Sequence, residues 1–278
     1  MLVVMKNKQL FLDHLNKNKT LIDDFNESGS QLYIWRSEPY LWLSIDGEQV
    51  QSIVDTSDPS RPILPVPQAM LIWTIWQNKL MPSKILNIGM GTGTIERYLA
   101  GGNYELTSIE SSKRVISITQ EHFNLPSKAH IIHTCGIEYS SHRAEQTRTN
   151  NKSPYSNTLA KYDVILVDIF ENEQTPRDIL SHEFYHNCHE ILDKGGILVL
   201  NLYLTQDQEL LAILAHTQHL FEFKCLIDFQ DYHNVVLMLS HSPIPEEAQL
   251  TQLINSRPEQ TSGLTHIKEI ISHMHLVS

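Results

Sequence analysis

The chain has 278 residues and is 41% hydrophobic, which is enough for a buried core of ordinary size. Its 21 basic and 32 acidic residues leave a formal net charge of −11 at pH 7, and no Lys/Arg cluster of the kind that binds a phosphate backbone occurs. Three widely spaced cysteines argue against a disulfide framework. The sequence contains neither a signal-peptide core nor an apolar run of membrane-spanning length. We therefore expect a cytoplasmic protein with neither nucleic acid nor a membrane as partner.

The amino-terminal part predicts a leader followed by a small β-sheet. Residues 1–30 mix apolar and polar residues at loose helical spacing, which is typical of a segment that packs on another part of the fold. From residue 31 to residue 53, apolar and polar residues alternate on both sides of Asp46 and Gly47. Period-two alternation around an Asp-Gly pair is the signal of a β-hairpin. We expect a small antiparallel sheet here.

The stretch from residue 84 to residue 110 combines a short apolar strand, a glycine loop, a helix and a second strand that ends at Glu110. The loop contains three glycines, Gly89, Gly91 and Gly93. Glycines let a ligand approach the backbone closely, and a carboxylate at the end of the next strand can accept hydrogen bonds from both ribose hydroxyls. This order of elements predicts a nucleotide-type ligand at the carboxyl edge of a parallel sheet.

Strands and helices alternate over the rest of the chain. The spacing predicts helix 68–80, helix 111–124, strand 129–134, strand 162–167 ending at Asp168, helix 181–192 closed by Lys194-Gly195-Gly196, strand 197–204, helix 206–219 and strands 221–229 and 235–239. Residues 140–160 are polar and predict a mobile surface insertion. In the last segment the pattern predicts helical pieces over 245–254 and 266–274.

These elements predict an α/β protein with a doubly wound, mostly parallel seven-stranded sheet and a small antiparallel sheet at the amino terminus. We divide the chain into three parts. They are an N-terminal leader and small β-sheet region over 1–66, a Rossmann-like cofactor-binding domain over 67–241 and a C-terminal helical tail over 242–278.

Between residues 31 and 240 the sequence resembles the spermidine synthase family and its bacterial spermidine-synthase-like relatives, within the class I methyltransferase fold. The most specific piece is Y-D-V-I-L-V-D-I-F-E-N-E-Q-T-P-R-D-I-L-S-H-E-F-Y at 162–185, followed by L-D-K-G-G-I-L-V-L-N. It is similar to the family's tyrosine-aspartate start, D-S-S-D-P-like active-site loop, E-F-Y helix entry and P-G-G turn. Members of this family transfer an aminopropyl group from decarboxylated S-adenosylmethionine to putrescine.

The resemblance implies a role for each matching residue. The three glycines of the loop would admit the co-substrate, which is S-adenosylmethionine or its decarboxylated form, and Glu110 would bind its ribose. Asp168 would be the base for the attacking amine, and Glu171 would replace the second aspartate of the active-site loop. Gln68 would face the transferred group, and Thr92 would belong to the cofactor site. The resemblance also implies a small-molecule acceptor, possibly a polyamine, together with a homodimer and no metal.

Several acids of the family are missing from this sequence. Thr92 stands where an aspartate should meet the donor's primary ammonium, and Ala69 replaces a glutamate. A decarboxylated donor and a diamine acceptor are both cationic, so their site needs carboxylates. S-adenosylmethionine carries its own carboxylate and has less need of an acid at Thr92. Two alternatives therefore stand beside aminopropyl transfer: a methyltransferase with an unknown acceptor, and a catalytically silent ligand-binding relative.

His182, Glu183 and His186 spell H-E-x-x-H, the helix signature of zinc metalloproteases. The apolar stripe of the same predicted helix leaves both histidines toward its polar side, and the family's E-F-Y helix explains the stretch without a metal. We expect no metal site here.

Overall fold

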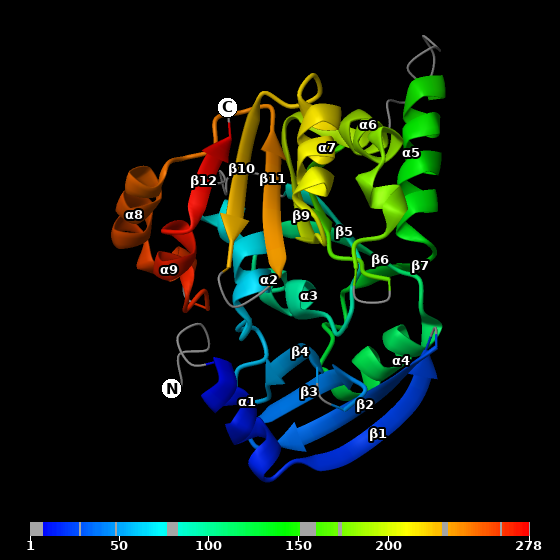
Figure 1. The fold of residues 1–278 in the computed structure, drawn as a ribbon, viewed down its shortest axis with the longest axis vertical. Helices are drawn as coiled ribbons and strands as arrows, with labels where there is room; N and C mark the ends of the chain where they lie inside the picture. Colours follow the sequence, from blue (N-terminus) through cyan, green and yellow to red (C-terminus); the bar gives the residue numbers. More distant parts are fainter. Residues whose placement is uncertain are drawn as a thin grey trace.

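The computed structural model describes residues 8–27, 29–47, 49–76, 83–150, 160–171, 174–229, 233–261 and 263–277. A small antiparallel sheet with α1 forms one end of the molecule, and a larger, mostly parallel sheet with helices on both faces forms the rest (Figure 1). This arrangement confirms the predicted fold class. Within the described residues, no helix is long and apolar enough to cross a lipid bilayer.

The small sheet has four antiparallel strands in the order β1-β2-β3-β4. They are β1 (Thr20–Glu27), β2 (Ser30–Ser37), β3 (Tyr40–Ile45) and β4 (Gln49–Asp55). Asp46 and Gly47 turn the chain between β3 and β4 with positive φ angles of 50° and 80°, as the hairpin signal predicts. Helix α1 (Lys8–Lys17) packs Phe11 and Leu15 on this sheet. Strand β1 was not predicted, because most of its residues are exposed and carry little apolar alternation.

The large sheet has the order β12-β10-β11-β9-β8-β5-β6-β7. Its strands are β5 (Ser83–Ile88), β6 (Tyr104–Glu110), β7 (His130–His133), β8 (Tyr162–Val167), β9 (Leu192–Tyr203), β10 (Phe223–Asp228), β11 (Asn234–Ser240) and β12 (Met274–Val277). Strands β7, β6, β5, β8 and β9 run parallel, and β11, β10 and β12 add antiparallel partners. Strand β12 is an eighth strand within the segment for which only helices were predicted.

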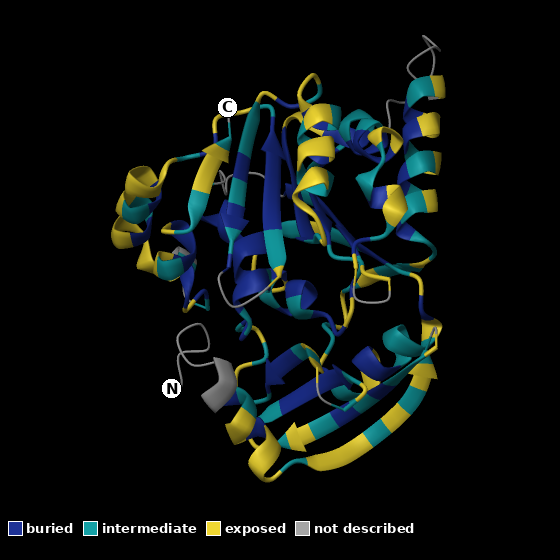
Figure 2. Ribbon diagram, in the orientation of Figure 1, coloured by how far each residue is buried: buried dark blue, intermediate teal, exposed yellow. Residues whose placement is uncertain are grey.

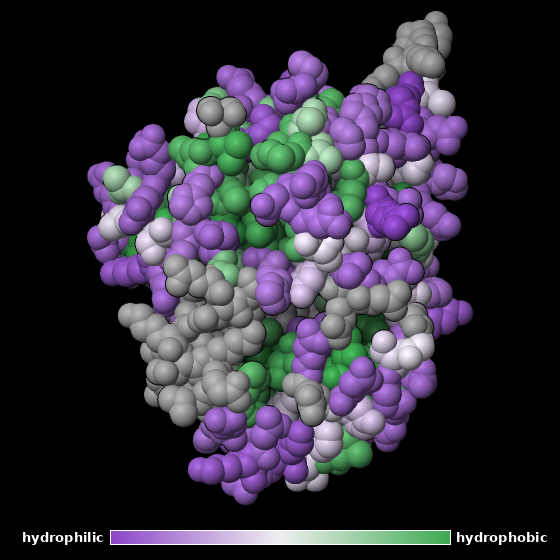
Figure 3. Space-filling model, in the orientation of Figure 1, coloured by the Kyte–Doolittle hydropathy of each residue, from purple (hydrophilic) through white to green (hydrophobic). Residues whose placement is uncertain are grey.

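Helices cover both faces of the large sheet, and one further helix, α4 (Lys113–His122), packs Ile118 on the small sheet. The others are α2 (Pro65–Met70), η1 (Ile72–Ile75), α3 (Thr94–Leu99), α5 (Gly136–Asn150), η2 (Arg177–Leu180), α6 (His182–Ile191), α7 (Asp207–Thr217), α8 (Glu247–Ser256), η3 (Pro258–Thr261) and α9 (Ile267–Ile271). One core joins α2, η1, α3, α8 and α9 to the sheet, and a second joins α5, α6 and α7 to the other face. The buried strands between these cores are dark blue in Figure 2. Polar residues cover much of the face drawn in Figure 3, with apolar surface over the upper part of the sheet and where the two sheets meet.

Two sequence predictions are wrong. Residues 140–150 belong to α5 instead of a mobile insertion, because Ser140, Ala144 and Thr147 form a small buried stripe that the polar composition hides. Residues 151–159 of that prediction lie outside the described residues. The predicted glycine stop at Gly195-Gly196 is the second error. Helix α6 ends at Ile191, and the buried Leu192, which has an extended backbone, is already the first residue of β9.

Gly196 is required by close packing and not by a helix stop. A Cβ atom at Gly196 would lie 2.6 Å from Leu192 Cγ and 2.9 Å from the Asp193 carbonyl oxygen, whereas at Gly195 it would meet nothing within 4 Å. Gly196→Ala should therefore lower the free energy of unfolding by about 1–3 kcal/mol, because the buried Leu192 has no room to move. Gly195→Ala is the matched control and should change it little. Urea denaturation of both variants tests this, and equal effects would contradict the packing argument.

Candidate active site

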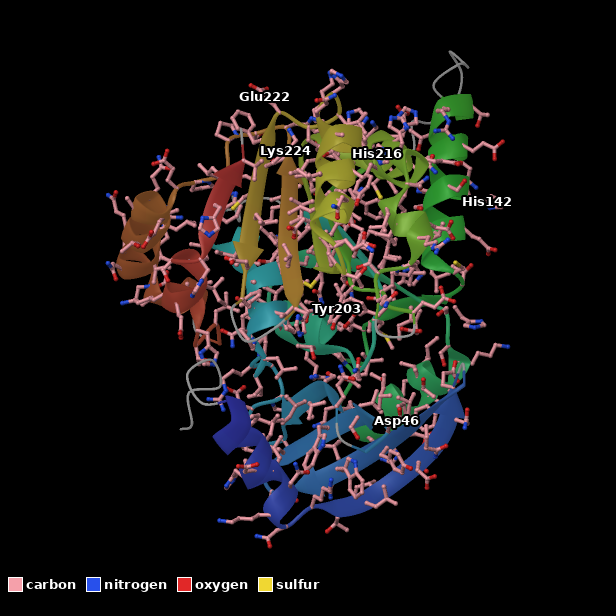
Figure 4. The ribbon with its side chains drawn as sticks, in the orientation of Figure 1. Asp46, His142, Tyr203, His216, Glu222 and Lys224 are labelled. Atoms are coloured by element: carbon pink, nitrogen blue, oxygen red, sulfur yellow. The ribbon has the colours of Figure 1, made fainter. Side chains whose placement is uncertain are left out.

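The carboxyl ends of the central parallel strands meet at the edge of the large sheet that faces the small sheet. Tyr203, the last residue of β9, lies at this edge in Figure 4, while Glu222 and Lys224 lie at the opposite edge. The Gly89 amide donates to the Ile109 carbonyl at 2.9 Å, and the Asp168 amide donates to the Ile88 carbonyl at 2.8 Å. These two bonds extend the ladders of β5, β6 and β8 past the strand ends. They bring the glycine loop, Glu110 and Asp168 together, as the sequence predicts.

The glycine loop depends on its glycines. Gly89 has φ of 92°, and a Cβ atom there would collide with the carbonyl group of Asp168. Gly91 has φ of 52°, and nothing lies within 4 Å of where its Cβ would be. The backbone is therefore open at Gly91, where a ligand can approach closely. Gly93, with φ of 78°, precedes the first residue of α3.

Glu110 lies at the end of β6, directly beside the loop. Its Oε1 accepts from the Ser112 amide at 2.9 Å, and its Oε2 accepts from the Gly91 amide at 3.2 Å. Burial raises the pKa of this carboxyl group, while the bonds from backbone amides act in the opposite direction. The backbone amides of Ser112, Gly91, Ser111 and Met90 all favour the ionised carboxylate, so the charge is held at the mouth of the glycine loop.

Asp168 follows β8 and is held by a pair of asparagines. Its Oδ1 accepts from Asn201 Nδ2 at 2.8 Å, and Asn201 Oδ1 in turn accepts from Asn234 Nδ2 at 3.0 Å. Burial raises the pKa of Asp168 to about 6, although the bond from Asn201 favours the ionised form. A carboxylate with this pKa can accept a proton near neutral pH. Neither asparagine was predicted, and the signal that was available is that Asn201 interrupts the apolar run of β9.

A pocket of about 80 Å³ lies between the small sheet and the glycine loop. Its walls come from β4, the segment after β4, the loop and Asp168, through Gln51, Ser52, Ile53, Ile63, Leu64, Pro67, Gly89, Met90, Gly91, Thr92, Thr94, Ile95 and Asp168. Among the described residues that line it, Asp168 is the only ionisable one. The rest of the wall is apolar or carries neutral hydroxyl and amide groups.

Hydroxyl groups gather at the side of the pocket formed by β4. Ser52 Oγ hydrogen-bonds Thr92 Oγ1 and lies 3.3 Å from Thr94 Oγ1. Arg97 lies beneath them, is 5% exposed, and donates from Nη2 to Thr94 Oγ1 at 3.2 Å. It also donates to the backbone carbonyls of Thr92, Pro59 and Phe123. Of these residues, the sequence pattern indicated only Thr92, because no pattern shows that Ser52 and Arg97 lie next to it.

Four predicted site residues do not line this pocket. Gly93 and Glu110 lie beside it, in the glycine loop and at the end of β6, whereas Gln68 and Glu171 are held by other contacts. Gln68 is fully buried, and its amide group donates to the Pro62 carbonyl at 2.9 Å and accepts from the His266 amide at 2.8 Å. Glu171 is exposed, and its backbone pairs with that of Gln174 through two amide-to-carbonyl hydrogen bonds of 2.9 and 3.0 Å. The structure thus brings together the glycine loop, Thr92, Glu110 and Asp168, but places Gln68 and Glu171 elsewhere.

The H-E-x-x-H stretch forms the first part of α6. The rings of His182 and His186 stack with centroids 6.2 Å apart, and His216 lies 5.9 Å from His182. His216 lies away from the edge marked by Tyr203 (Figure 4). In the described part of the chain, no three His, Cys, Asp or Glu side chains are grouped so that they could hold a metal ion.

No protein-family model matches the chain. Curated relatives do: it is 26% identical over 216 residues to a polyamine aminopropyltransferase of Neisseria meningitidis, covering 76% of each protein. It is 23% identical over 226 residues to a polyamine aminopropyltransferase of Chromobacterium violaceum, covering 80% of this chain and 79% of the relative. A shorter match joins it to an N-terminal histidine N-methyltransferase of Emericella nidulans, 28% identical over 43% of this chain and 20% of that protein.

Solved structures share the fold. A probable spermidine synthase from Corynebacterium glutamicum superposes with a TM-score of 0.69 and 18% identity, covering 88% of this chain and 95% of the other. Human methyltransferase-like protein 13 superposes with a TM-score of 0.61 and 15% identity, covering 71% of this chain and 92% of the other. Spermidine synthase from Thermotoga maritima superposes with a TM-score of 0.55 and 16% identity, covering 80% of this chain and 72% of the other. The chain is therefore similar in sequence to polyamine aminopropyltransferases, and it shares the class I methyltransferase fold with spermidine synthases and methyltransferases.

Proposed function

We propose that the chain is a transferase that binds S-adenosylmethionine or its decarboxylated form and transfers the donor's three-carbon amine chain to a small-molecule amine. Aminopropyl transfer to a polyamine is the first reaction to test, since relatives at 23–26% identity are named polyamine aminopropyltransferases. The observation that carries the proposal is the position of Asp168, a carboxylate with a raised pKa in the pocket beside the glycine loop. A cytoplasmic homodimer is part of the same proposal.

The residues present fit an adenosyl donor. Gly91 leaves the loop backbone open, and the carboxylate of Glu110 lies beside it at the end of β6, where a ribose-binding acid is expected. The pocket of about 80 Å³ is much smaller than a typical small-molecule site of about 300–1,000 Å³. The nucleoside would therefore lie along Gly91 and Glu110, and the end that carries the transferred group would enter the pocket toward Asp168.

Asp168 can then serve as the base of an in-line displacement. The acceptor nitrogen attacks the carbon next to the donor's sulfonium, the carbon–sulfur bond breaks, and its electron pair remains on sulfur as a thioether. The proton lost by the nitrogen passes to an Asp168 oxygen and from there to solvent. Asn234 fixes the amide of Asn201, which in turn fixes the carboxylate, so the base is oriented before the acceptor binds.

Methyl transfer from S-adenosylmethionine is the second candidate. It is favoured by Thr92, which puts a neutral hydroxyl in place of an acid, and by the shorter match to a histidine N-methyltransferase. The two reactions leave different nucleosides, because chain transfer releases methylthioadenosine and methyl transfer releases S-adenosylhomocysteine. Calorimetric titration with methylthioadenosine and both donors, followed by product analysis with putrescine as acceptor, separates them. No binding of any of the three compounds would contradict both reactions.

Asp168→Asn should reduce turnover by about 10²–10⁴-fold, the usual contribution of a positioned base. The variant should fold normally, because a neutral amide replaces a carboxylate whose ionisation burial disfavours. Its melting temperature should be unchanged or higher. Initial rates and thermal melts measured on the same preparation test both statements, and full activity of the variant would exclude Asp168 as the base.

The rate should also fall as the pH drops through about 6, because Asp168 must be ionised to accept a proton and its pKa is raised to about 6. Asn201→Leu removes the donor that favours the ionised carboxylate, so the inflection should move to higher pH. Profiles of kcat/KM against pH for the two proteins provide the measurement. An unchanged inflection in Asn201→Leu would show that another group controls the rate.

A further inference from the structure

Arg97 sets the hydrogen-bond direction at one end of the group of hydroxyls that lines the pocket. The Arg97 guanidinium can only donate hydrogen bonds, so the Thr94 oxygen must accept from it. The Thr94 hydroxyl proton is then available for another acceptor. Ser52 Oγ, 3.3 Å away, can receive that proton and pass its own to Thr92 Oγ1. The Thr92 proton is then left at the end of the chain. The pocket side formed by these residues presents a hydrogen-bond donor.

The charge beneath these hydroxyls is positive. Burial lowers the pKa of Arg97 to about 10, so its guanidinium remains protonated at neutral pH. The adjacent Glu96 is also buried, and burial raises the pKa of its carboxyl group. Its Oε1 accepts from Asn87 and Ser108 at 2.8 and 2.6 Å. Within the described structure its Oε2 has no hydrogen-bond partner.

A cation below and a hydroxyl donor above favour an anionic ligand group. A ligand carboxylate would accept from Thr92 and be attracted by Arg97, whereas a lone ammonium would find no carboxylate on this side and would be repelled by the same cation. Because Arg97 is buried and much of the pocket wall is apolar, its charge is screened less than it would be in bulk water.

We propose that Thr92, Ser52 and Arg97 select a donor that keeps its carboxylate, which is S-adenosylmethionine itself and not the decarboxylated form. This inference rests on the proposed function, since it needs an adenosyl donor in the pocket. The acceptor nitrogen then attacks the first carbon of the donor's amino acid chain, the one bonded to the sulfonium, and a 3-amino-3-carboxypropyl group is transferred. The nitrogen–carbon bond forms, the carbon–sulfur bond breaks with its electrons on sulfur, methylthioadenosine leaves, and the acceptor's proton goes to Asp168.

Calorimetric titration of the full chain with methylthioadenosine, S-adenosylmethionine and decarboxylated S-adenosylmethionine tests the selection. The protein should bind S-adenosylmethionine at least about 10-fold more tightly than the decarboxylated donor. Thr92→Val, which keeps the side-chain shape and removes the hydroxyl, should abolish most of this preference. Thr92→Asp should reverse it, because a carboxylate would then face the donor's ammonium. Thr217→Val removes an equally buried hydroxyl in α7, outside the pocket, and should keep the preference.

The possible results separate this inference from the proposed function. If the protein binds methylthioadenosine but binds the decarboxylated donor as tightly as S-adenosylmethionine, or if Thr92→Val keeps the full preference, the selection is overturned and the proposed function stands. If none of the three compounds binds, both fail. With an amine acceptor, mass spectrometry supplies a second readout, because the carboxylated product is heavier than the aminopropyl product by one carbon dioxide.

Discussion

The close approach of two backbones at Gly89 and Asp168 is the constraint on which the rest of the site depends. Any side chain at Gly89 would collide with the Asp168 carbonyl, so the ends of β5 and β8 can lie side by side only with glycine there. That approach puts Asp168 at the wall of the pocket formed by the glycine loop. It also lets the loop turn toward β6, where the Gly91 amide binds Glu110. A short distance between strand ends thus determines where both carboxylates lie.

The residues at strand ends could be predicted from the sequence, and those that join distant segments could not. Glu110 and Asp168 follow from the alternation of strands and helices, because parallel strands present their carboxyl ends at one edge. Ser52 belongs to another sheet, and its period-two pattern does not show that it faces the loop. Arg97 reads as an ordinary residue of a short helix. Gln68 and Glu171 were taken from a family resemblance, and their hydrogen bonds, to His266 and to Gln174, are made away from the pocket wall.

Among the helices and strands, too, those with local sequence signals could be predicted and those that depend on tertiary packing could not. The hairpin at Asp46-Gly47 and strand β8 came from local signals and were confirmed. Helix α5 was missed because its buried stripe consists of small residues, which carry little hydrophobic signal. Strand β12 was missed because four residues are too few for a pattern, and its pairing with β10 is set by tertiary contacts. Packing of small side chains and long-range pairing are properties that a single sequence does not display.

The hydrogen bonds of Gln68 join parts of the chain that are made at very different times. Its amide accepts from His266, 198 positions later, and the adjoining Pro67 lines the pocket. During synthesis the small sheet, the glycine loop and Asp168 all leave the ribosome before the segment that supports this wall. Contacts of such long sequence separation form late and slowly, since a large loop must close first. The chemical groups of the site are therefore synthesised well before the segment around His266 that supports the pocket wall at Pro67.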